Sequence, residues 1–172
     1  MQDFVHLHVH TQYSLLDGQA SVSRLVDKAM KDGMKGIAVT DHGNMFGIKE
    51  FTNYVNKKNS GPKGEIKDLK KRIAGIESGE IECEDKEAEI ADCRAKMAEA
   101  ESKLFKPIVG CEMYVARRTM DKKEGKPDQS GYHLIVLAKN EKGYHNLIKL
   151  VSHAWTRGYY MRPRTDRSEL EK

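Results

Sequence analysis

The sequence predicts an α/β fold, a parallel sheet or barrel into which a charged helical hairpin is inserted. Three observations favour this fold. An alternating segment opens the chain, short apolar segments with the composition of buried strands follow, and amphipathic helical patterns separate them. The predicted order is strand, helix, strand, helix, hairpin, strand, strand and helix, which is typical of a sheet covered by helices.

The first predicted strand spans residues 4–9 and carries a row of histidines on one face. His6, His8 and His10 alternate with apolar residues, so their side chains project in the same direction. Asp17 follows the strand, and Asp17-Gly18 indicates a turn. The segment therefore predicts a strand with histidines along one face, followed by a turn that carries Asp17.

Two helices and a short strand are expected next. Ser21 is a candidate N-cap of a helix that continues to about residue 32, where Gly33 ends it. Residues 36–40 have the composition of a buried strand, and a helical pattern covers residues 46–56. The apolar residues expected to face the core are Val22, Leu25, Val26, Ala29, Phe46, Phe51, Tyr54 and Val55.

Residues 60–104 differ from their surroundings and predict a helical hairpin. Charged residues fill the intervals of two apolar repeats, and Gly79 between the repeats permits a reversal of the chain. The first repeat is Ile66, Leu69, Ile73 and Ile76, and the second is Cys83, Ile90, Met97 and Leu104. We expect residues 1–59 and 105–172 to form one domain and residues 60–104 to be an insertion in it.

The last part of the chain predicts two strands and a helix. The strands are expected at residues 108–116 and 132–138, and the helix at residues 141–156. The buried face expected for this helix is Leu147, Ile148, Val151, Ala154 and Trp155. Residues 157–172 are polar and basic, and no core element is predicted there.

Composition excludes several classes of protein. No apolar run approaches the ~20 residues that cross a bilayer, and the first residues lack the layout of a secretory signal. Cys83, Cys93 and Cys111 are too widely spaced for a thiolate zinc site and are odd in number for a disulfide framework. We therefore expect a cytoplasmic protein without a membrane partner.

The basic residues are concentrated towards the end of the chain. Residues 117–172 hold 13 basic and 7 acidic residues. Such a surface favours a partner that carries phosphate, and a merely solvated surface explains the charge equally well. Arg162 and Arg164 are the candidate contacts to nucleic acid. An exposed segment without a ligand remains the alternative.

Pairs of polar residues at predicted strand ends suggest a metal centre. His8 and His10 lie at i and i+2 on one strand face, so their ring nitrogens can meet at one cation, although incidental surface histidines have the same pattern. Asp41 and His42 follow the second strand. An aspartate that caps a helix, beside a histidine with protein partners, would explain this second pair too.

Further candidate ligands occur on the remaining strands and loops. Asp17 follows the first strand, Glu112 lies within the third strand and His133 lies near the start of the fourth. Taken with the two histidine motifs, they favour a site for several metal ions, in which carboxylates bridge ions and imidazoles bind one ion each. His6 shares the face of His8 and His10, and we expect it either to pack or to support the ligands from outside.

A family resemblance is carried by four blocks: HLHVHTQYSLLDG, GIAVTDHGNMFG, KPIVGCEMYV and GYHLIVLAKNEKGYHNLIKLVS. They resemble successive parts of the PHP domain (polymerase and histidinol phosphatase). More narrowly, they are similar to the version that opens bacterial family C replicative polymerases, the polymerase III alpha subunits. The resemblance implies a distorted (β/α)7 barrel with up to three divalent metal ions, zinc or manganese. Its motifs imply six ligands, His8, His10, Asp17, His42, Glu112 and His133, and a supporting role for Asp41.

The resemblance also implies a function. The domain is expected to be a metal-dependent phosphoesterase of the 3′–5′ exonuclease type beside a polymerase, whose own magnesium site is absent from this chain. The expected partners are primer-template DNA, the sliding clamp and a proofreading exonuclease. One alternative is a non-catalytic scaffold that docks the exonuclease, and another is a separate phosphatase similar to histidinol phosphatase.

The chain departs from the family pattern after His133. The family has a later cysteine or histidine and an Asp-x-His pair, and residues 134–172 do not supply them. We therefore expect a truncated barrel, part of a longer polymerase, that is inactive by itself. Such a chain should expose apolar barrel surface and associate with itself.

Overall fold

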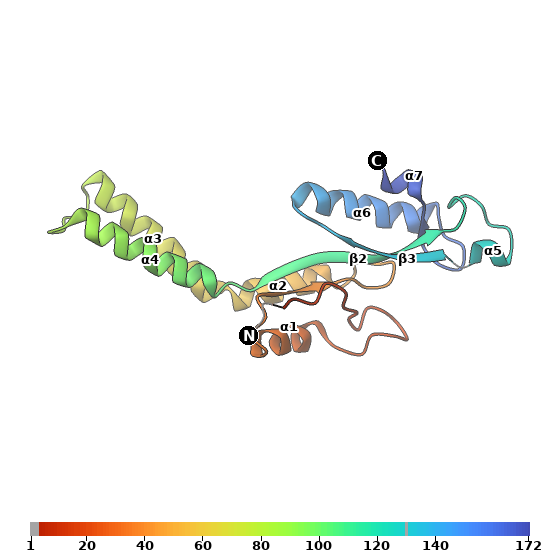
Figure 1. Cartoon of the computed structure of the whole chain (residues 1–172), viewed down its shortest axis with the longest axis horizontal. Coiled ribbons are helices and arrows are strands. Elements are labelled where there is room, and N and C mark those ends of the chain that lie inside the picture. Colours follow the sequence, from red (N-terminus) through yellow and green to blue (C-terminus); the bar gives the residue numbers. More distant parts are fainter. Residues whose placement is uncertain (1–3, 130) are drawn as a thin grey trace. The chain divides into compact units, whose positions relative to one another are not determined.

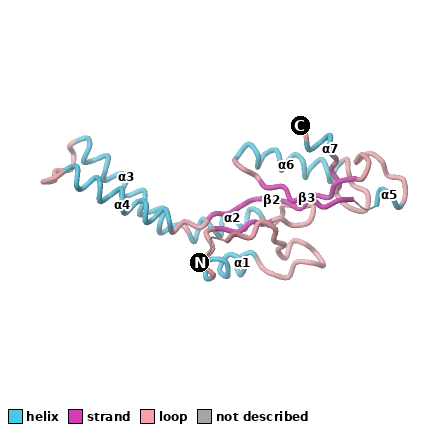
Figure 2. Tube along the Cα trace, viewed as in Figure 1, coloured by secondary structure: helices cyan, strands magenta, loops and turns pink. Residues whose placement is uncertain are grey.

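The computed structural model describes residues 4–129 and 131–172. The chain forms two compact units: one comprises the residues up to Thr52 together with Pro107–Lys172, and the other comprises Asn53–Lys106. The helices and strands of both units are drawn in Figures 1 and 2. The second unit contains the region 60–104 for which the hairpin was predicted.

The first unit is built on a mixed, open sheet. Its strands are β1 (Gly36–Val39), β2 (Lys106–Ala116), β3 (Gly131–Leu137) and β4 (Arg164–Thr165). The order is β1-β2-β3, and β4 also pairs with β2. β2 and β3 are antiparallel, whereas β2 and β4 are parallel. The α/β class is thus confirmed. The prediction of a wholly parallel sheet is wrong, because β2 and β3 pair side by side and run in opposite directions.

The alternation along β2 separates two faces of the sheet. Cys111 and Met113 are fully buried and pack with Leu147 and Ala154 of α6 (Glu141–Thr156). Glu112 lies between them in the sequence and therefore points to the other face. In Figure 1, α6 and α1 (Val22–Lys31) lie on opposite sides of the sheet. The strand thus places an acidic residue on the face that α6 does not cover.

The expected strand over residues 4–9 is extended backbone without a regular ladder. Its backbone bonds to the β1 region are Ala38 N to His6 O and Thr40 N to Val9 O, both 2.9 Å long. The Val9 N–H donates to the Thr40 hydroxyl instead of a backbone carbonyl, at 2.9 Å. The ladder is interrupted at this point because a side chain takes the place of the backbone acceptor. The segment still runs beside β1.

The predicted helices are present, but three residues of their expected buried faces, Phe46, Ile148 and Trp155, are exposed, Ile148 by 38%. α1 starts directly after Ser21, α2 spans Ile48–Lys58 and α6 has the predicted bounds. Phe46 and Trp155 were expected in the core, but they are 65% and 43% exposed. Phe46 precedes α2, so helical periodicity does not govern its direction. Trp155 lies at the border of the α6 face, where its indole N–H donates to Gly43 O.

Residues after the last helix are folded, contrary to expectation. They form β4 and the short helix α7 (Arg167–Leu170), which Asp166 caps by accepting from Glu169 N at 3.1 Å. Arg164 is only 1% exposed. Its guanidinium donates to four backbone carbonyls, those of Met120, Lys122, Asp128 and Gly158. The charge is buried because the loop around α5 (Lys126–Gln129) offers these oxygens.

The second unit contains an antiparallel pair of helices, α3 (Ser60–Ser78) and α4 (Lys86–Ser102). Gly79 ends α3 with φ of 81°, a conformation that glycine adopts readily. Ile76, Cys93 and Ala100 are the buried residues of the helix pair, with Gly75. Within α4 the predicted repeat of seven contains Ile90 and Met97, whereas the buried residues are Cys93 and Ala100, which are themselves seven residues apart.

The two ends of the helix pair are joined by one side chain. The Asn59 amide donates to Phe105 O at 2.8 Å and accepts from Phe105 N at 2.9 Å. Asn59 is 4% exposed, so both bonds are protected from water. The chain therefore enters and leaves α3 and α4 at adjacent points. Among the described residues, no helix has the length and apolar character needed to span a membrane.

Candidate metal centre

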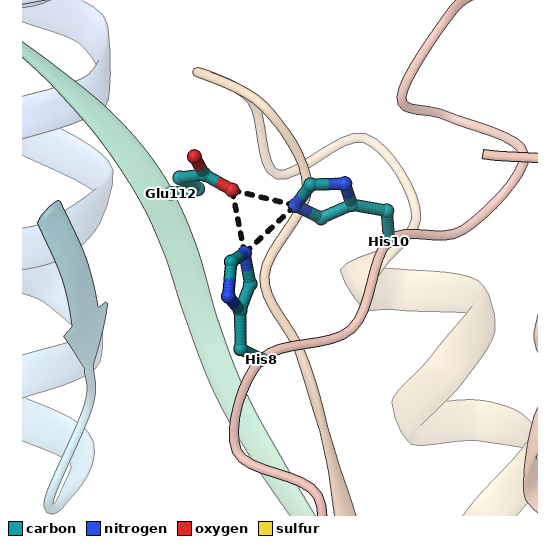
Figure 3. Close-up of side chains that lie close together, drawn as sticks. All are labelled: His8, His10 and Glu112. Carbon is teal, nitrogen blue, oxygen red and sulfur yellow. Dashed lines mark hydrogen bonds and ion pairs between the residues drawn. The ribbon is translucent and has the colours of Figure 1, made fainter. Parts of the chain in front are cut away.

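Three of the predicted ligands meet around one carboxylate oxygen. His8 Nε2 and His10 Nε2 each lie 2.6 Å from Glu112 Oε2, and the two nitrogens lie 3.0 Å from each other. Figure 3 shows the three side chains pointing towards one another, Glu112 from β2 and the histidines from the extended segment. Residues more than a hundred positions apart in the sequence thus present their ligand atoms to the same point.

The other three predicted ligands extend this cluster on both sides. Asp17 Oδ2 lies 2.5 Å from His10 Nδ1 and 3.1 Å from His42 Nε2. Glu112 Oε1 contacts His133 Nδ1, and His42 Nδ1 lies 3.6 Å from Glu112 Oε2. Each carboxylate therefore contacts at least two imidazoles, which is the arrangement expected of residues that bridge neighbouring cations.

The six side chains form three groups of three potential ligands, and within each group the ligand atoms lie within 4.8 Å of one another. The groups share members, so that His10, His42 and Glu112 each belong to two. The groups are His8, His10 and Glu112; His10, Asp17 and His42; and His42, Glu112 and His133. This is a multinuclear donor set of nitrogen and oxygen ligands.

The elements of the sheet explain why the ligands converge. Glu112 N donates to Asp41 O, and Gly43 N donates to Glu112 O, which brings His42 beside Glu112. On the other side, β2 pairs with β3 in a register that puts Tyr114 opposite His133. Because Glu112 and Tyr114 are two residues apart, their side chains and that of His133 share one face.

Asp41 holds the loop that carries Asp17. Its carboxylate accepts from Thr11 N at 2.6 Å, from the Thr11 hydroxyl at 2.8 Å and from the Ser14 hydroxyl at 2.7 Å. Asp41 is 1% exposed and belongs to none of the three ligand groups. Its bonds are therefore fully used to fix the backbone between His10 and Asp17, so it supports the site from outside.

Two predicted site residues lie elsewhere. His6 belongs to none of the three groups among the described residues, and its ring packs edge-on against Phe4 with centroids 4.7 Å apart. The supporting role expected of His6 therefore stays a prediction. Arg164 was expected to contact nucleic acid. That expectation is wrong, because its guanidinium is buried and saturated by backbone carbonyls.

Arg162, the other predicted contact, lies at the edge of the centre. Its guanidinium sits 4.8 Å from the centroid of the Tyr114 ring, and Nη1 donates to the Tyr114 hydroxyl at 2.8 Å. Tyr114 stacks on His42 with centroids 5.8 Å apart. Tyr114 was not among the predicted site residues, although its position two residues after Glu112 on a strand indicates that the two side chains share one face.

The electrostatics of the centre favour ionised carboxylates. Burial acts to raise the pKa of Glu112, but hydrogen bonds from His8, His133 and His10 outweigh it and lower the pKa to about 2. The hydrogen bond from His10 is the main cause of the lowered pKa of Asp17. Burial acts to lower the pKa of His10, yet its bonds to Asp17 and Glu112 raise it above 6.5.

The donor set fits divalent metal ions. Neutral imidazole and carboxylate together suit zinc, manganese and iron. His42 Nδ1 is buried and has no hydrogen-bond partner among the described residues, although it lies close to Glu112 Oε2. An unpaired buried nitrogen is costly unless a cation or another donor uses its lone pair. The arrangement therefore has the donor chemistry of a site for divalent cations.

Comparison with known proteins agrees with this geometry. The family model of the PHP domain matches residues 6–172. DNA polymerase III subunit alpha of Borreliella burgdorferi is 40% identical over 98% of the chain and 11% of the relative. Subunits of the same name from Treponema pallidum and Aquifex aeolicus are 39% and 33% identical, over 95% and 99% of the chain and 10% and 11% of the relatives. The chain spans about a tenth of the length of these relatives. On the family match over residues 6–172, the chain belongs to the PHP domain family.

Proposed function

We propose that this chain is the metal-binding phosphoesterase domain of a bacterial replicative DNA polymerase and acts as a 3′–5′ exonuclease-type module. The observation that carries the proposal is the convergence of His8, His10, Asp17, His42, Glu112 and His133 in three overlapping ligand groups. The similarity to polymerase III alpha subunits supplies the context of DNA replication.

The chemistry assigned to the metals, zinc or manganese and up to three in the complete domain, is activation of water and stabilisation of the leaving oxygen of a phosphate ester. The chain contributes the positions of the ligands. Glu112, with its pKa lowered to about 2, stays ionised at neutral pH and would hold cations together with the histidines around it. Asp41 fixes the loop that presents Asp17, and Arg162 supplies positive charge for a phosphate oxygen at the rim.

The remaining elements of the proposal rest on the family and the relatives. The open sheet would be part of a distorted (β/α)7 barrel, and residues 60–104 would be a helical insertion closed by Asn59 and Phe105. We place the domain in a longer cytoplasmic polymerase chain with its own magnesium site. Its partners there would be primer-template DNA, the sliding clamp and a proofreading exonuclease.

The test measures hydrolysis by the longer polymerase chain in which we place this domain. The substrate is a single-stranded oligodeoxynucleotide with a 5′ label, supplied with manganese or zinc. Glu112→Gln and His8→Ala should abolish shortening from the 3′ end and lower the metal content. His145→Ala is the matched control, since this histidine is exposed on α6 and lies outside the ligand groups.

Two outcomes would count against the phosphoesterase. Metal content that is unchanged in both ligand variants would contradict the metal centre itself. Metal bound by the wild-type protein without any hydrolysis would instead favour a non-catalytic scaffold that docks a separate exonuclease.

A further inference from the structure

A cavity of about 400 Å³ opens directly beside the metal centre. His42, a member of two ligand groups, is one of its lining residues. Five aromatic side chains also line it: Tyr13, Phe46, Tyr114, Trp155 and Tyr159. They come from four separate segments of the first unit. This concentration of rings adjoins the candidate ligands, and the ligand groups do not use them.

Three of these rings are exposed and arranged face to face or tilted against each other. Phe46, Trp155 and Tyr159 are 65%, 43% and 49% exposed. Trp155 and Tyr159 stack with centroids 5.7 Å apart and an angle of 21° between their planes, and Phe46 lies 6.4 Å from Trp155. Flat aromatic surfaces of this kind accept the faces of other planar rings.

Phe46, Trp155 and Tyr159 together form an aromatic platform, and Trp155, which contacts the other two rings, is held in place by a hydrogen bond. The Trp155 indole N–H donates to Gly43 O at 2.8 Å, next to His42 in the sequence. Gly43 itself is tightly enclosed, because a Cβ there would lie 2.7 Å from Pro163 Cγ. The position of the indole is therefore tied to the same strand end that presents His42.

Positive charge also lines the cavity, beside Tyr114. Arg162 lines the cavity and stacks over Tyr114, whose other contacts are with His42 and His133. Only its Nη1 is bonded to Tyr114, so other N–H groups of the guanidinium can still donate. Met161 adopts φ of 61°, an unusual conformation for a residue with a side chain, within the tight turn that pairs Tyr160 with Arg162.

We propose that this cavity binds the unpaired end of a DNA strand. Bases stack on Trp155, Tyr159 and Phe46, and Arg162 holds a backbone phosphate at the entrance to the metal centre. Unpaired bases fit such a surface because their faces are free, whereas duplex bases already stack on their neighbours. The cation beside the rings favours a polyanion over an apolar peptide. The inference rests on the proposed function and names the substrate of that site.

The test uses the intrinsic fluorescence of Trp155, the single tryptophan of the chain. Single-stranded oligothymidylate of about eight nucleotides is added in the presence of a metal chelator, so that hydrolysis and metal content do not enter the result. Stacking should quench the fluorescence of Trp155. An oligomer of equal length that lacks its bases should bind more weakly and leave the fluorescence unchanged.

Variants separate the platform from general charge attraction. Tyr159→Ala and Arg162→Gln should each weaken binding about tenfold, measured by fluorescence anisotropy of a labelled oligonucleotide. Tyr132→Ala is the matched control, since Tyr132 is 60% exposed on β3 and does not line the cavity. Because all three residues are at least partly exposed, thermal unfolding should show that the variants keep their fold.

Equal binding of the oligomer without bases, or equal weakening by Tyr132→Ala, would overturn the platform. Absence of quenching at saturating oligonucleotide would overturn it as well and would leave the surface to a protein partner. Loss of hydrolysis in the longer polymerase with intact quenching here would count against the phosphoesterase and not against this binding site.

Discussion

Two buried charged residues on adjacent strands of the sheet have different kinds of hydrogen-bond partner. Glu112 on β2 is 3% exposed and Arg164 on β4 is 1% exposed. Arg164 is surrounded by backbone carbonyls from the loop around α5 and from Gly158. Glu112 is surrounded by the nitrogens of four histidines. The same degree of burial therefore occurs in two regions with different partners.

The two sets of partners differ in whether they can lose a proton. Backbone carbonyls are permanent acceptors, so the four oxygens around Arg164 keep their bonds as long as the segment is folded. An imidazole can lose its proton and offer a lone pair to a cation. The surroundings of Arg164 thus form an anchor that holds the segment in place, whereas those of Glu112 are candidate ligands, at which protons and metal ions are expected to compete.

The largest effect is expected from breaking the anchor. Arg164→Met removes the guanidinium that donates to the carbonyls of Met120, Lys122, Asp128 and Gly158, and we expect a loss of about 3–5 kcal/mol in the free energy of unfolding. Urea denaturation measures this change. Arg167→Ala is the control, since its side chain is 91% exposed, and it should change stability by less than about 0.5 kcal/mol. A loss below about 1 kcal/mol for Arg164→Met would contradict the anchor.

The second effect concerns metal affinity and not the fold. Glu112→Gln keeps the shape of the side chain but removes the charge that contacts the histidines. Metal affinity should fall at least about tenfold, while the metal-free protein should lose less stability than Arg164→Met does. Equilibrium dialysis with manganese and urea denaturation in chelator measure the two quantities. A Glu112→Gln variant as unstable as Arg164→Met would remove the distinction between the regions.

As pH falls, the metal centre and the C-terminal segment should be affected at different pH values. The raised pKa of His10 stabilises the metal-free fold below pH 6.5, and this contribution disappears as pH rises through the raised pKa. Protons therefore compete with metal, and metal affinity should fall as pH drops through the same pKa. Burial acts to raise the pKa of Asp166, but bonds from Met120, Ser168 and Glu169 lower it below 3.8.

The stability that Asp166 contributes is present above pH 3.8 and is lost as pH falls through its lowered pKa. Metal affinity should thus fall at a higher pH than that at which the C-terminal segment unfolds. Dialysis against manganese across pH and circular dichroism on the same samples measure both events. Simultaneous loss of metal and helical signal would show that the two regions are one cooperative unit.

The sequence could predict the candidate metal centre better than the anchor, for physical reasons. Spacing of two along a strand and position at a strand end are local patterns, and they predicted His8, His10 and His42, while Glu112 within its strand was predicted from its carboxylate and the family motif. The burial of Arg164 depends on carbonyls of residues 120, 122, 128 and 158, which no local pattern connects. The exposure of Trp155 likewise depends on Gly43, more than a hundred residues away in the sequence.

The smallest effect is expected from removing residues 60–104. Asn59 and Phe105 bond to each other in both directions, so a short glycine linker should join them without strain. Neither the anchor nor the ligand groups include a residue of this segment. Manganese affinity should therefore stay within about twofold of that of the intact chain. A large loss of metal would show that the helix pair supports the centre and is not a separable insertion.

The central claim is that ligands from distant segments hold cations at one place, and anomalous diffraction tests it most directly. Crystals grown with manganese, measured at the manganese absorption edge, should show peaks about 2.0–2.3 Å from the nitrogens of His8 and His10 and from Glu112 Oε2. Further peaks should lie beside His42 and His133. Peaks only at histidines outside the three groups, such as His145, or no peak at all in crystals soaked to saturation, would contradict the account.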